Sequence, residues 1–278
     1  MKIIILGASG LIGSGIRKVL ERDKEKNIIC TFFCNELFKK LAIKNSYSFN
    51  VLKDNFIFDF ISNEKPDLII NCLGITKHLS KLYSEEEQIE VNGNFPKKLS
   101  ILSSKINSRF IQISTDCVFI GKKGLYSEID KPDAQDIYGK SKIMGEEVQN
   151  THLVLRTSTI GREIGTFYGL LEWFLRQKNR CNGYREAYFS GITNVELGKI
   201  IQKYIIPNNF CKGIYNVGSE RINKYDLLNK FSIHYKKNIN IKVDNKFKID
   251  RSLDVDKFTN KFQYRVKSWE IMLKELDE

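Results

Sequence analysis

The sequence has little of the features that mark several specialised classes of protein. Only four of its 278 residues are proline, while 42% are hydrophobic and 28% are charged, which argues against extended disorder and predicts a sizeable core. No apolar run approaches membrane-spanning length, and the six cysteines form no CxxC pair and no metal-ligand spacing. We therefore expect free thiols, no metal site and no membrane partner. With no signal-like segment before Lys2, we also expect a cytoplasmic protein.

The formal net charge of +12 raises the question of nucleic acid, but the basic residues are scattered. The chain has no block of five or more basic residues and no zinc-knuckle or RNA-recognition signature, so we expect no nucleic-acid partner. Two interpretations stay open: the lysines form solvated faces, or they attract an anionic, phosphorylated substrate or cofactor.

The N-terminal residues have the pattern of a dinucleotide-binding fold. A short apolar strand at residues 2–6 runs into Gly7-Ala8-Ser9-Gly10-Leu11-Ile12-Gly13, followed by a predicted helix at residues 14–21. The glycines allow a tight turn in which backbone amides and a helix N-terminus approach a pyrophosphate. The second strand, residues 27–33, ends in Cys34-Asn35 rather than in the acidic residue that would bind the ribose of NAD. This difference favours NADPH, with NADH as the alternative.

The rest of the chain alternates strands and helices. We expect strands at residues 46–50, 68–74, 109–114, 152–156, 184–190 and 213–217. We expect helices at residues 36–43, 54–62, 193–204, 225–231 and 269–276. Three further helices are expected, one from Ser84 onward, one around Tyr138 and one around Trp173. A capping box, Ser84 to Glu87, opens one helix, which Phe95-Pro96 should bend or interrupt. The predicted fold class is α/β, a Rossmann-type doubly wound parallel sheet at residues 1–156. A smaller α/β substrate-binding lobe follows at residues 157–278, with some segments returning to the first domain.

Residues 114–142 carry the predicted chemistry. If the segment around Tyr138 is helical, Tyr138 and Lys142 lie one turn apart on the same face. The ammonium would then favour the phenolate and lower the tyrosine pKa toward the range of a general acid or base. Thr115, at the end of an apolar strand, can hydrogen-bond the same substrate oxygen. This arrangement suits reversible reduction of a carbonyl, because hydride addition puts charge on an oxygen that a positioned acid neutralises.

Five motifs stand in order along the chain: Gly7-x-x-Gly10-x-x-Gly13, Asn71 to Gly74, Val91-Asn92, Ser114-Thr115-Asp116-x-Val118-Phe119 and Tyr138-x-x-x-Lys142. Together they resemble the extended short-chain dehydrogenase/reductase family and, within it, dTDP-4-dehydrorhamnose reductase and related nucleotide-sugar 4-ketoreductases. The resemblance continues through residues 156–158, 191–193, 213–217 and 250–254, so it covers nearly the whole chain.

The resemblance implies a role for each motif. Tyr138 would donate the proton, Lys142 would bind the nicotinamide ribose, and Thr115 would hydrogen-bond the carbonyl. The implied cofactor-binding residues, besides Tyr138 and Lys142, are Gly7, Ser9, Gly10, Leu11 and Ile12 at the pyrophosphate, Asn50 and Val51 at adenine, Cys72, Leu73 and Gly74 against the flat ring, and Asn92 in support. For residues 72–74, simple tight packing is an equal alternative.

Substrate contacts are expected from both halves of the chain. Arginine suits phosphate oxygens, so the candidates for gripping a nucleotide diphosphate are Arg156, Arg162, Arg180 and Arg185, unless they prove structural or solvated. The expected contacts from the first half are Thr76, Asp116, Val118 and Phe119. Relatives that use magnesium have acidic residues after the fourth strand, where this chain has Thr76-Lys77-His78, so no metal is expected.

These observations predict NADPH-dependent reduction of the 4-keto group of a nucleotide-linked 4-keto-6-deoxy sugar, in surface polysaccharide precursor synthesis. The open alternatives are a nucleotide-sugar epimerase or dehydratase of the same fold, and a catalytically silent nucleotide-binding regulatory subunit. A dehydratase needs an extra acid-base pair beside the threonine, and Cys117 stands where its second carboxylate would be expected. The family often dimerises through the helix that holds Tyr138, so the resemblance is also compatible with a homodimer.

Overall fold

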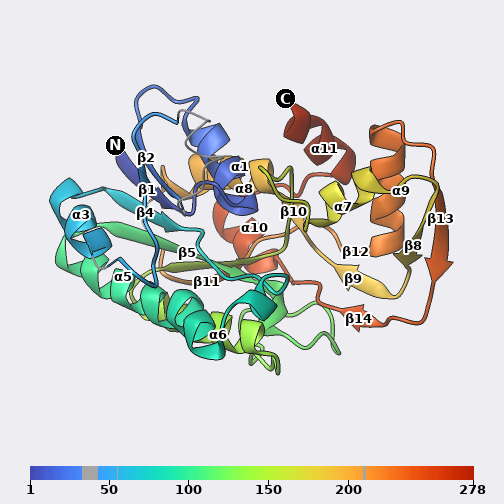
Figure 1. Ribbon diagram of the computed structural model, residues 1–278, viewed down its shortest axis with the longest axis horizontal. Coiled ribbons are helices and arrows are strands. Elements are labelled where there is room, and N and C mark those ends of the chain that lie inside the picture. Colours follow the sequence, from blue (N-terminus) through green and yellow to red (C-terminus); the bar gives the residue numbers. More distant parts are fainter. Residues whose placement is uncertain (33–42, 55, 209–210) are drawn as a thin grey trace.

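The computed structural model describes residues 1–32, 43–54, 56–208 and 211–278, and a parallel β-sheet lies at its centre (Figure 1). Within these residues, seven strands form the sheet in the order β3-β2-β1-β4-β5-β6-β11. They are β1 (Lys2–Leu6), β2 (Asn27–Phe32), β3 (Ser46–Ser48), β4 (Leu68–Asn71), β5 (Arg109–Thr115), β6 (Leu153–Thr157) and β11 (Gly213–Asn216). All neighbouring pairs are parallel. The order runs outward in both directions from β1 and β4, which confirms the predicted doubly wound α/β fold.

Successive residues of each strand face opposite sides of the sheet, because side chains alternate along an extended chain. In β1, Ile3 and Ile5 belong to one apolar cluster and Ile4 and Leu6 to another, and all four are fully buried. The first cluster includes side chains of α1 (Leu11–Leu20) and α8 (Asn194–Ile200), and the second those of α3 (Phe56–Glu64) and α5 (Phe95–Lys105). Figure 1 shows these helices on the two faces of the sheet. Burial on both faces explains the almost unbroken apolar sequence of β1.

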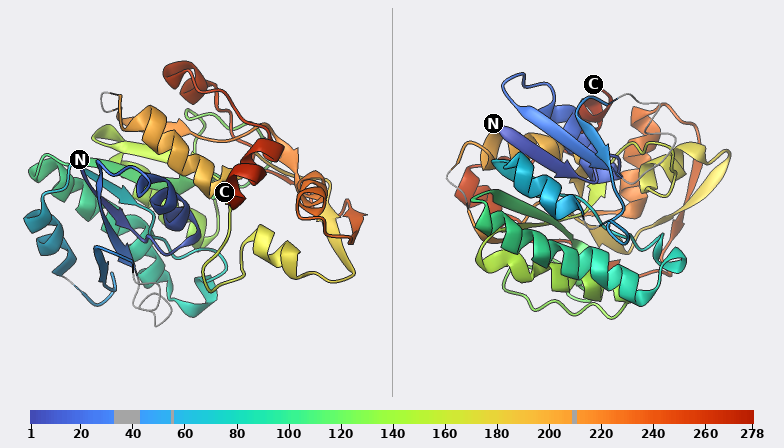
Figure 2. Two further views of the ribbon diagram at one scale, coloured as in Figure 1. Left: turned by 90° about the horizontal axis from the view of Figure 1, so that it is seen from above. Right: turned by 60° about the vertical axis from the view of Figure 1, so that its left-hand side comes forward.

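The second half of the chain adds to this sheet and forms small sheets beside it. β11 is an outer strand of the central sheet, next to β6, and α8 packs against α1. The small sheets pair β7 with β10, β8 with β13, and β9 with both β12 and β14. These and the remaining helices are β7 (Thr159–Ile160), β8 (Arg180–Tyr184), β9 (Ala187–Phe189), β10 (Ile192–Thr193), β12 (Ile222–Asn223), β13 (Asn240–Asp244), β14 (Ile249–Asp250), α7 (Leu170–Arg176), α9 (Lys224–His234), α10 (Asp256–Phe262) and α11 (Trp269–Asp277). In Figures 1 and 2, β8, β13 and α9 lie at the end of the molecule opposite α3.

Several elements differ from their predicted positions. The first helix begins at Leu11 rather than at residue 14, and the strand predicted at residues 68–74 ends at Asn71. The strand predicted at 184–190 is divided between β8 and β9, because the chain turns at residues 185–186. The sequence patterns do not predict β13, β14 or α10. The helix predicted at 36–43 and the strand end at Phe33 to Asn35 lie outside the described residues, apart from residue 43.

Two helices begin at hydrogen-bonded caps of the type that the sequence predicts. The Ser84 hydroxyl accepts from the N–H of Glu87 at 3.2 Å, and the Glu87 carboxylate accepts from the N–H of Ser84 at 2.8 Å, where α4 (Glu85–Ile89) begins. At the start of α8, the Thr193 hydroxyl accepts from the N–H of Glu196 at 3.2 Å. In the part of the chain that is described, no helix has both the length and the apolarity needed to cross a membrane.

Candidate active site

The end of β5 and the start of α6 (Ile137–Gly145) bring together two of the predicted catalytic side chains. Thr115 is the last residue of β5 and is 8% exposed, and Tyr138 lies in the first turn of α6, where the Thr115 side chain is close enough to affect the pKa of the phenol. That hydroxyl accepts from the N–H of Cys117 at 3.1 Å and donates to Oδ1 of Asp116 at 3.1 Å. A hydroxyl and a phenol are thus placed to share one ligand oxygen.

Lys142 lies one turn beyond Tyr138 on the same face of α6. Its side chain is 6% exposed, and its Nζ donates to the carbonyl of Ile113 in β5 at 2.8 Å. Burial lowers the pKa of Lys142 to about 8, although the carboxylate of Glu146 acts in the opposite direction. A Cβ added to Gly74 would lie 3.9 Å from this Nζ, so the ammonium sits beside the segment that follows β4. A buried cation with so low a pKa is typical of a functional site.

The predicted lowering of the Tyr138 pKa by Lys142 is wrong. Burial raises the pKa of Tyr138, and nearby acidic groups, among them Asp116, add to the rise. The reason is the direction of the Lys142 side chain, which is bonded to Ile113, while the phenol interacts with Thr115. The phenol therefore keeps its proton at neutral pH, which suits a proton donor.

Asn92 lies in the π-helical turn η2 (Glu90–Asn94), between α4 and α5. Its fully buried side chain accepts from the N–H of Ile75 at 2.9 Å, and donates to the Ile75 carbonyl at 3.1 Å and to Oγ of Ser141 at 3.0 Å. These bonds tie the segment after β4 to α6. Pro96, a predicted interruption of the helix, lies in the first turn of α5, directly after η2, so the hydrogen-bond pattern changes from π-helical to α-helical next to the proline.

The glycine turn places the predicted pyrophosphate residues at the carboxyl end of β1. Gly7 has φ +78°, a left-handed conformation that favours glycine, and its carbonyl accepts from the N–H of Gly10 at 3.1 Å. A Cβ at Gly13 would lie 2.2 Å from the same carbonyl oxygen, and one at Gly7 would lie 3.0 Å from the Leu73 side chain. The two predicted cofactor segments, residues 7–13 and 72–74, are therefore adjacent. Side chains added at Gly7 and Gly13 would collide with the protein's own atoms, so glycine permits the close packing of a turn that fits a dinucleotide.

Asn50 and Val51 follow β3 at the same edge of the sheet. Oδ1 of Asn50 accepts from the N–H of Leu52 at 2.9 Å, and the N–H of Asn50 donates to Asp54 at 2.6 Å, so these residues form a tight turn. Val51 and Leu73 both pack against the apolar cluster below α3 and α5. This position is compatible with the predicted contact to adenine.

Three of the predicted substrate residues are enclosed in the interior. Arg156 is 1% exposed and forms a two-bond ion pair with Glu146, Nε to Oε1 at 2.9 Å and Nη2 to Oε2 at 2.7 Å. Val118 and Phe119 are fully buried, and the Phe119 ring stacks on that of Tyr126 with the ring centroids 4.1 Å apart. Side chains so enclosed cannot contact a sugar nucleotide, so the predicted substrate contact is wrong for these three residues. They pack in the interior beside the site.

The other predicted substrate residues are accessible, except Asp116, which is 6% exposed. Thr76, Arg180 and Arg185 are exposed. Arg162 is also exposed, but its guanidinium is bonded to the Glu172 carboxylate at 2.6 Å. Thr76 and the arginines therefore stay available to a ligand, and the arginines retain their predicted role as a hypothesis.

The segment Thr76-Lys77-His78 reaches α6 by an ion pair. Lys77 bonds to Asp136 at 2.8 Å, and Asp136 caps α6 by accepting from the N–H of Gly139 at 2.9 Å. Asp136 therefore links the first turn of the Tyr138 helix to the segment that follows β4. Across residues 1–32, 43–54, 56–208 and 211–278, no group of three or more His, Cys, Asp or Glu side chains could hold a metal ion.

Two cations from the second half reach the catalytic end of β5, and the sequence reasoning did not assign either to the site. Arg251, after β14, donates from Nε to the Phe119 carbonyl at 2.8 Å, and its Nη1 lies 3.6 Å from Sγ of Cys117. Burial raises the pKa of Asp116, an effect that Lys224 and Arg251 oppose. Burial also lowers the pKa of Lys224, at the start of α9, to about 8. The family-like run that contains Arg251 is the only sequence signal for this cluster.

Comparisons with known proteins agree with this geometry. Residues 1–176 match the family described as the RmlD substrate binding domain. The dTDP-4-dehydrorhamnose reductase of Aggregatibacter actinomycetemcomitans is 28% identical over 238 residues, which are 81% of this chain and 76% of that protein. The methionine adenosyltransferase 2 subunit beta of Bos taurus is 26% identical over 152 residues, which are 52% of this chain and 42% of that protein.

Among solved structures, the dTDP-4-dehydrorhamnose reductase of Bacillus anthracis in complex with NADP has a TM-score of 0.82 at 19% identity, covering 99% of this chain and 98% of that one. At that identity the similarity shows the fold alone. The predicted enzyme class, an NAD(P)-dependent oxidoreductase, is confirmed at the level of the family. Since the match covers well over half of its residues, this chain belongs to the RmlD substrate-binding domain family.

Proposed function

We propose that this protein reduces the 4-keto group of a nucleotide-linked 4-keto-6-deoxy sugar with NADPH. The observation that carries the proposal is the placement of Thr115, Tyr138 and Lys142 beside the segment after β4, which itself contacts the glycine turn. A protonated phenol, an adjacent hydroxyl and a buried ammonium form a site that can protonate an oxygen on which charge develops. The family match supports a sugar nucleotide as the substrate.

Each side chain has its own task in this proposal. Tyr138 donates its phenolic proton to the carbonyl oxygen, and Thr115 turns its hydroxyl from Asp116 toward the same oxygen. The bound cofactor supplies the hydride. Lys142 binds the ribose hydroxyls, and its charge stabilises the phenolate that proton transfer leaves on Tyr138. Because the Lys142 pKa is about 8, the ammonium is the main form at neutral pH.

The accessible cations are the proposed contacts with the diphosphate. Arg180 and Arg185 are exposed, whereas the guanidinium of Arg162 already forms an ion pair with Glu172. Lys224 and Arg251 add positive charge next to Asp116, and the net charge of +12 favours an anionic ligand in general. Thr76 and Asp116 stay as proposed contacts with the sugar.

The wider setting is also a proposal. We expect residues 1–156 to hold the cofactor and residues 157–278 to form most of the substrate lobe. We further expect NADPH to be preferred over NADH, the reaction to serve surface polysaccharide precursors in the cytoplasm, and the chain to be able to form a homodimer. Sedimentation of the purified protein would test the last point directly.

The direct test is nicotinamide oxidation with a panel of dTDP-, UDP- and GDP-linked 4-keto-6-deoxy sugars. NADPH and NADH are offered separately, and Tyr138→Phe runs beside the native chain. We expect turnover with one nucleotide class, faster with NADPH, and a loss of about 100-fold or more in Tyr138→Phe. Conversion of a substrate to its epimer without net oxidation of NADPH would instead identify an epimerase.

The second candidate function is a silent nucleotide-binding subunit. It is favoured by the similarity to methionine adenosyltransferase 2 subunit beta. The presence of Thr115, Tyr138 and Lys142 together argues against it, since a silent subunit has no need of all three. Saturable binding of NADPH with no turnover across the whole panel would favour the silent subunit over the reductase.

A further inference from the structure

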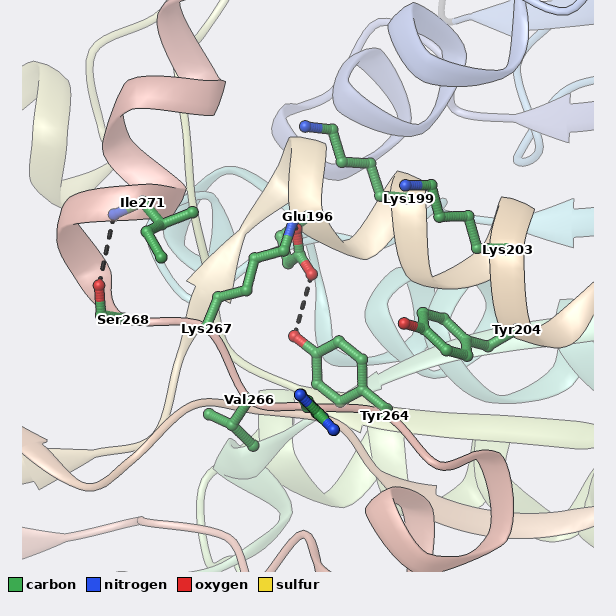
Figure 3. Close-up of a pocket in the computed structure, with 10 residues that line it drawn as sticks. Glu196, Lys199, Lys203, Tyr204, Tyr264, Val266, Lys267, Ser268 and Ile271 are labelled. Atoms are coloured by element: carbon green, nitrogen blue, oxygen red, sulfur yellow. Dashed lines mark hydrogen bonds and ion pairs between the residues drawn. The ribbon is translucent and has the colours of Figure 1, made fainter.

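A cavity of about 320 Å³ lies between α8 with the π-helical turn η5 (Ile201–Ile205) on one side and the segment that leads into α11 on the other (Figure 3). Its lining includes Lys199, Lys203 and Tyr204 from the first side and Tyr264, Arg265 and Lys267 from the second. None of the residues that line it belongs to the proposed cofactor or substrate site.

Among the described residues that line the cavity, the one carboxylate already has hydrogen-bond partners. Glu196 is 1% exposed, accepts from the Tyr264 hydroxyl at 3.0 Å and bonds to Lys267 at 2.8 Å. Figure 3 shows Glu196 and Tyr264 pointing toward each other, with the bond between them dashed. Glu275 pairs with Lys199 at 3.2 Å and with Lys267 at 2.8 Å, which leaves neither lysine without a carboxylate. These bonds fix the inner wall of the cavity.

The remaining cations in the lining give the cavity an excess of positive charge. Lys203 and Arg265 are exposed, and no carboxylate pairs with either of them within the described residues. A second cavity, of about 510 Å³ between α9 and α11, shows the contrast. It is lined by three basic and three acidic side chains, and there Lys230 is paired with Glu270 and Arg221 with Asp250. Only the first of these two cavities has a charge that calls for an anion.

We propose that this cavity binds a phosphate-bearing small molecule, with Lys203 from one side and Arg265 from the other supplying the positive charge. The guanidinium fork of arginine and the ammonium of lysine are the side chains that most often hold phosphate. The partly buried Tyr204, whose ring meets that of Tyr264 edge-on at 5.4 Å, offers an apolar surface and a hydroxyl to the rest of the ligand. A concave site of this volume suits a molecule of nucleotide size or smaller rather than a polymer.

Calorimetric titration of inorganic pyrophosphate into the full chain tests the proposal. The protein is first saturated with NADP⁺, so that the glycine turn cannot take up the probe. We expect saturable binding at one site that weakens at least tenfold in Lys203→Ala/Arg265→Ala. The affinity for pyrophosphate should change less than twofold in Lys230→Ala, the matched control at the second cavity. Both substituted residues are exposed, and thermal unfolding of the variants confirms that they fold.

The result does not depend on turnover, so it is separate from the test of the proposed reductase. Equal affinity of the native chain and the double variant would overturn the proposal, because the pyrophosphate would then sit elsewhere. Loss of binding in Arg185→Ala with retention in the double variant would place the probe at the proposed substrate diphosphate contact, and would overturn it as well. Binding of polyadenylate without saturable binding of pyrophosphate would indicate a surface for nucleic acid and exclude the small-molecule site.

Discussion

Two buried cations lie close together in the sequence, one on α6 and one on β6, and their surroundings differ. Arg156 is 1% exposed, and its Nε and Nη2 both donate hydrogen bonds to the carboxylate of Glu146. This carboxylate also accepts a hydrogen bond from the Ser114 hydroxyl at 2.6 Å. Lys142 is 6% exposed, and its hydrogen bond goes to a backbone carbonyl. Burial lowers its pKa to about 8.

The difference separates a structural cation from a functional one. A buried charge costs several kcal/mol unless a partner neutralises it, and Glu146 does this for Arg156. Within the described residues no carboxylate is bonded to Lys142, so it carries that cost, which a fold tolerates where the charge meets a ligand. Both residues were candidates for function from the sequence, and only the pattern of partners tells them apart.

The largest expected effect is on turnover at Lys142. We expect Lys142→Met to lower kcat/KM by about 100-fold to 10,000-fold, because the ribose loses its anchor and the Tyr138 phenolate its counter-charge. Lys140→Met, an exposed lysine on the same helix, is the matched control and should stay within twofold. Steady-state kinetics with the substrate found in the panel would measure both. Equal losses in the two variants would show that Lys142 has no special role.

The next effect is on folding at Arg156. We expect Arg156→Met to lower the free energy of unfolding by about 3–5 kcal/mol, because it leaves Glu146 as an unpaired buried charge. Arg156→Met/Glu146→Gln should recover part of the loss, since the charge is gone. Urea denaturation measures all three chains. A loss below about 1 kcal/mol in the single variant would contradict the structural role.

Lys142→Met should have the opposite effect on stability. The folded pKa of about 8 lies below the ordinary 10.5, so folding disfavours the protonated form, and this penalty is complete below pH 8 and disappears as the pH rises through 10.5. After the cost of one lost hydrogen bond is subtracted, we expect Lys142→Met to raise the free energy of unfolding by about 1–2 kcal/mol at pH 7. Urea denaturation at pH 7 and pH 9.5 would show the gain shrinking. A destabilised variant at pH 7 would mean that Lys142 is held for structure.

These outcomes also show what the sequence can and cannot predict. The glycine turn, the Ser84 cap and the Tyr138–Lys142 spacing are local, so their positions follow from neighbouring residues. The pairing of Arg156 depends on where α6 ends and β6 begins, which no spacing rule fixes. Lys224 and Arg251 meet the end of β5 only through the packing of the second half, whose short strands β13 and β14 carry no strong pattern.

The smallest effect concerns a partly exposed cation in the same region. Lys97 on α5 pairs with Glu147 at 2.8 Å, with side chains 33% and 63% exposed. We expect Lys97→Ala to change the free energy of unfolding by about 0.5 kcal/mol or less, because water already solvates both charges. If Lys97→Ala lowered the free energy of unfolding as much as Arg156→Met, the contribution of an ion pair to stability would depend on the pairing itself and not on its burial.

The measurement that tests the central assignment most directly is a fluorescence titration of NADPH into the native chain and into Lys142→Met. The account predicts saturable binding to the native chain and an affinity at least tenfold lower in the variant, with its fold retained. The same affinity in both chains would contradict it, since Lys142 would then be a buried cation that does not meet the cofactor.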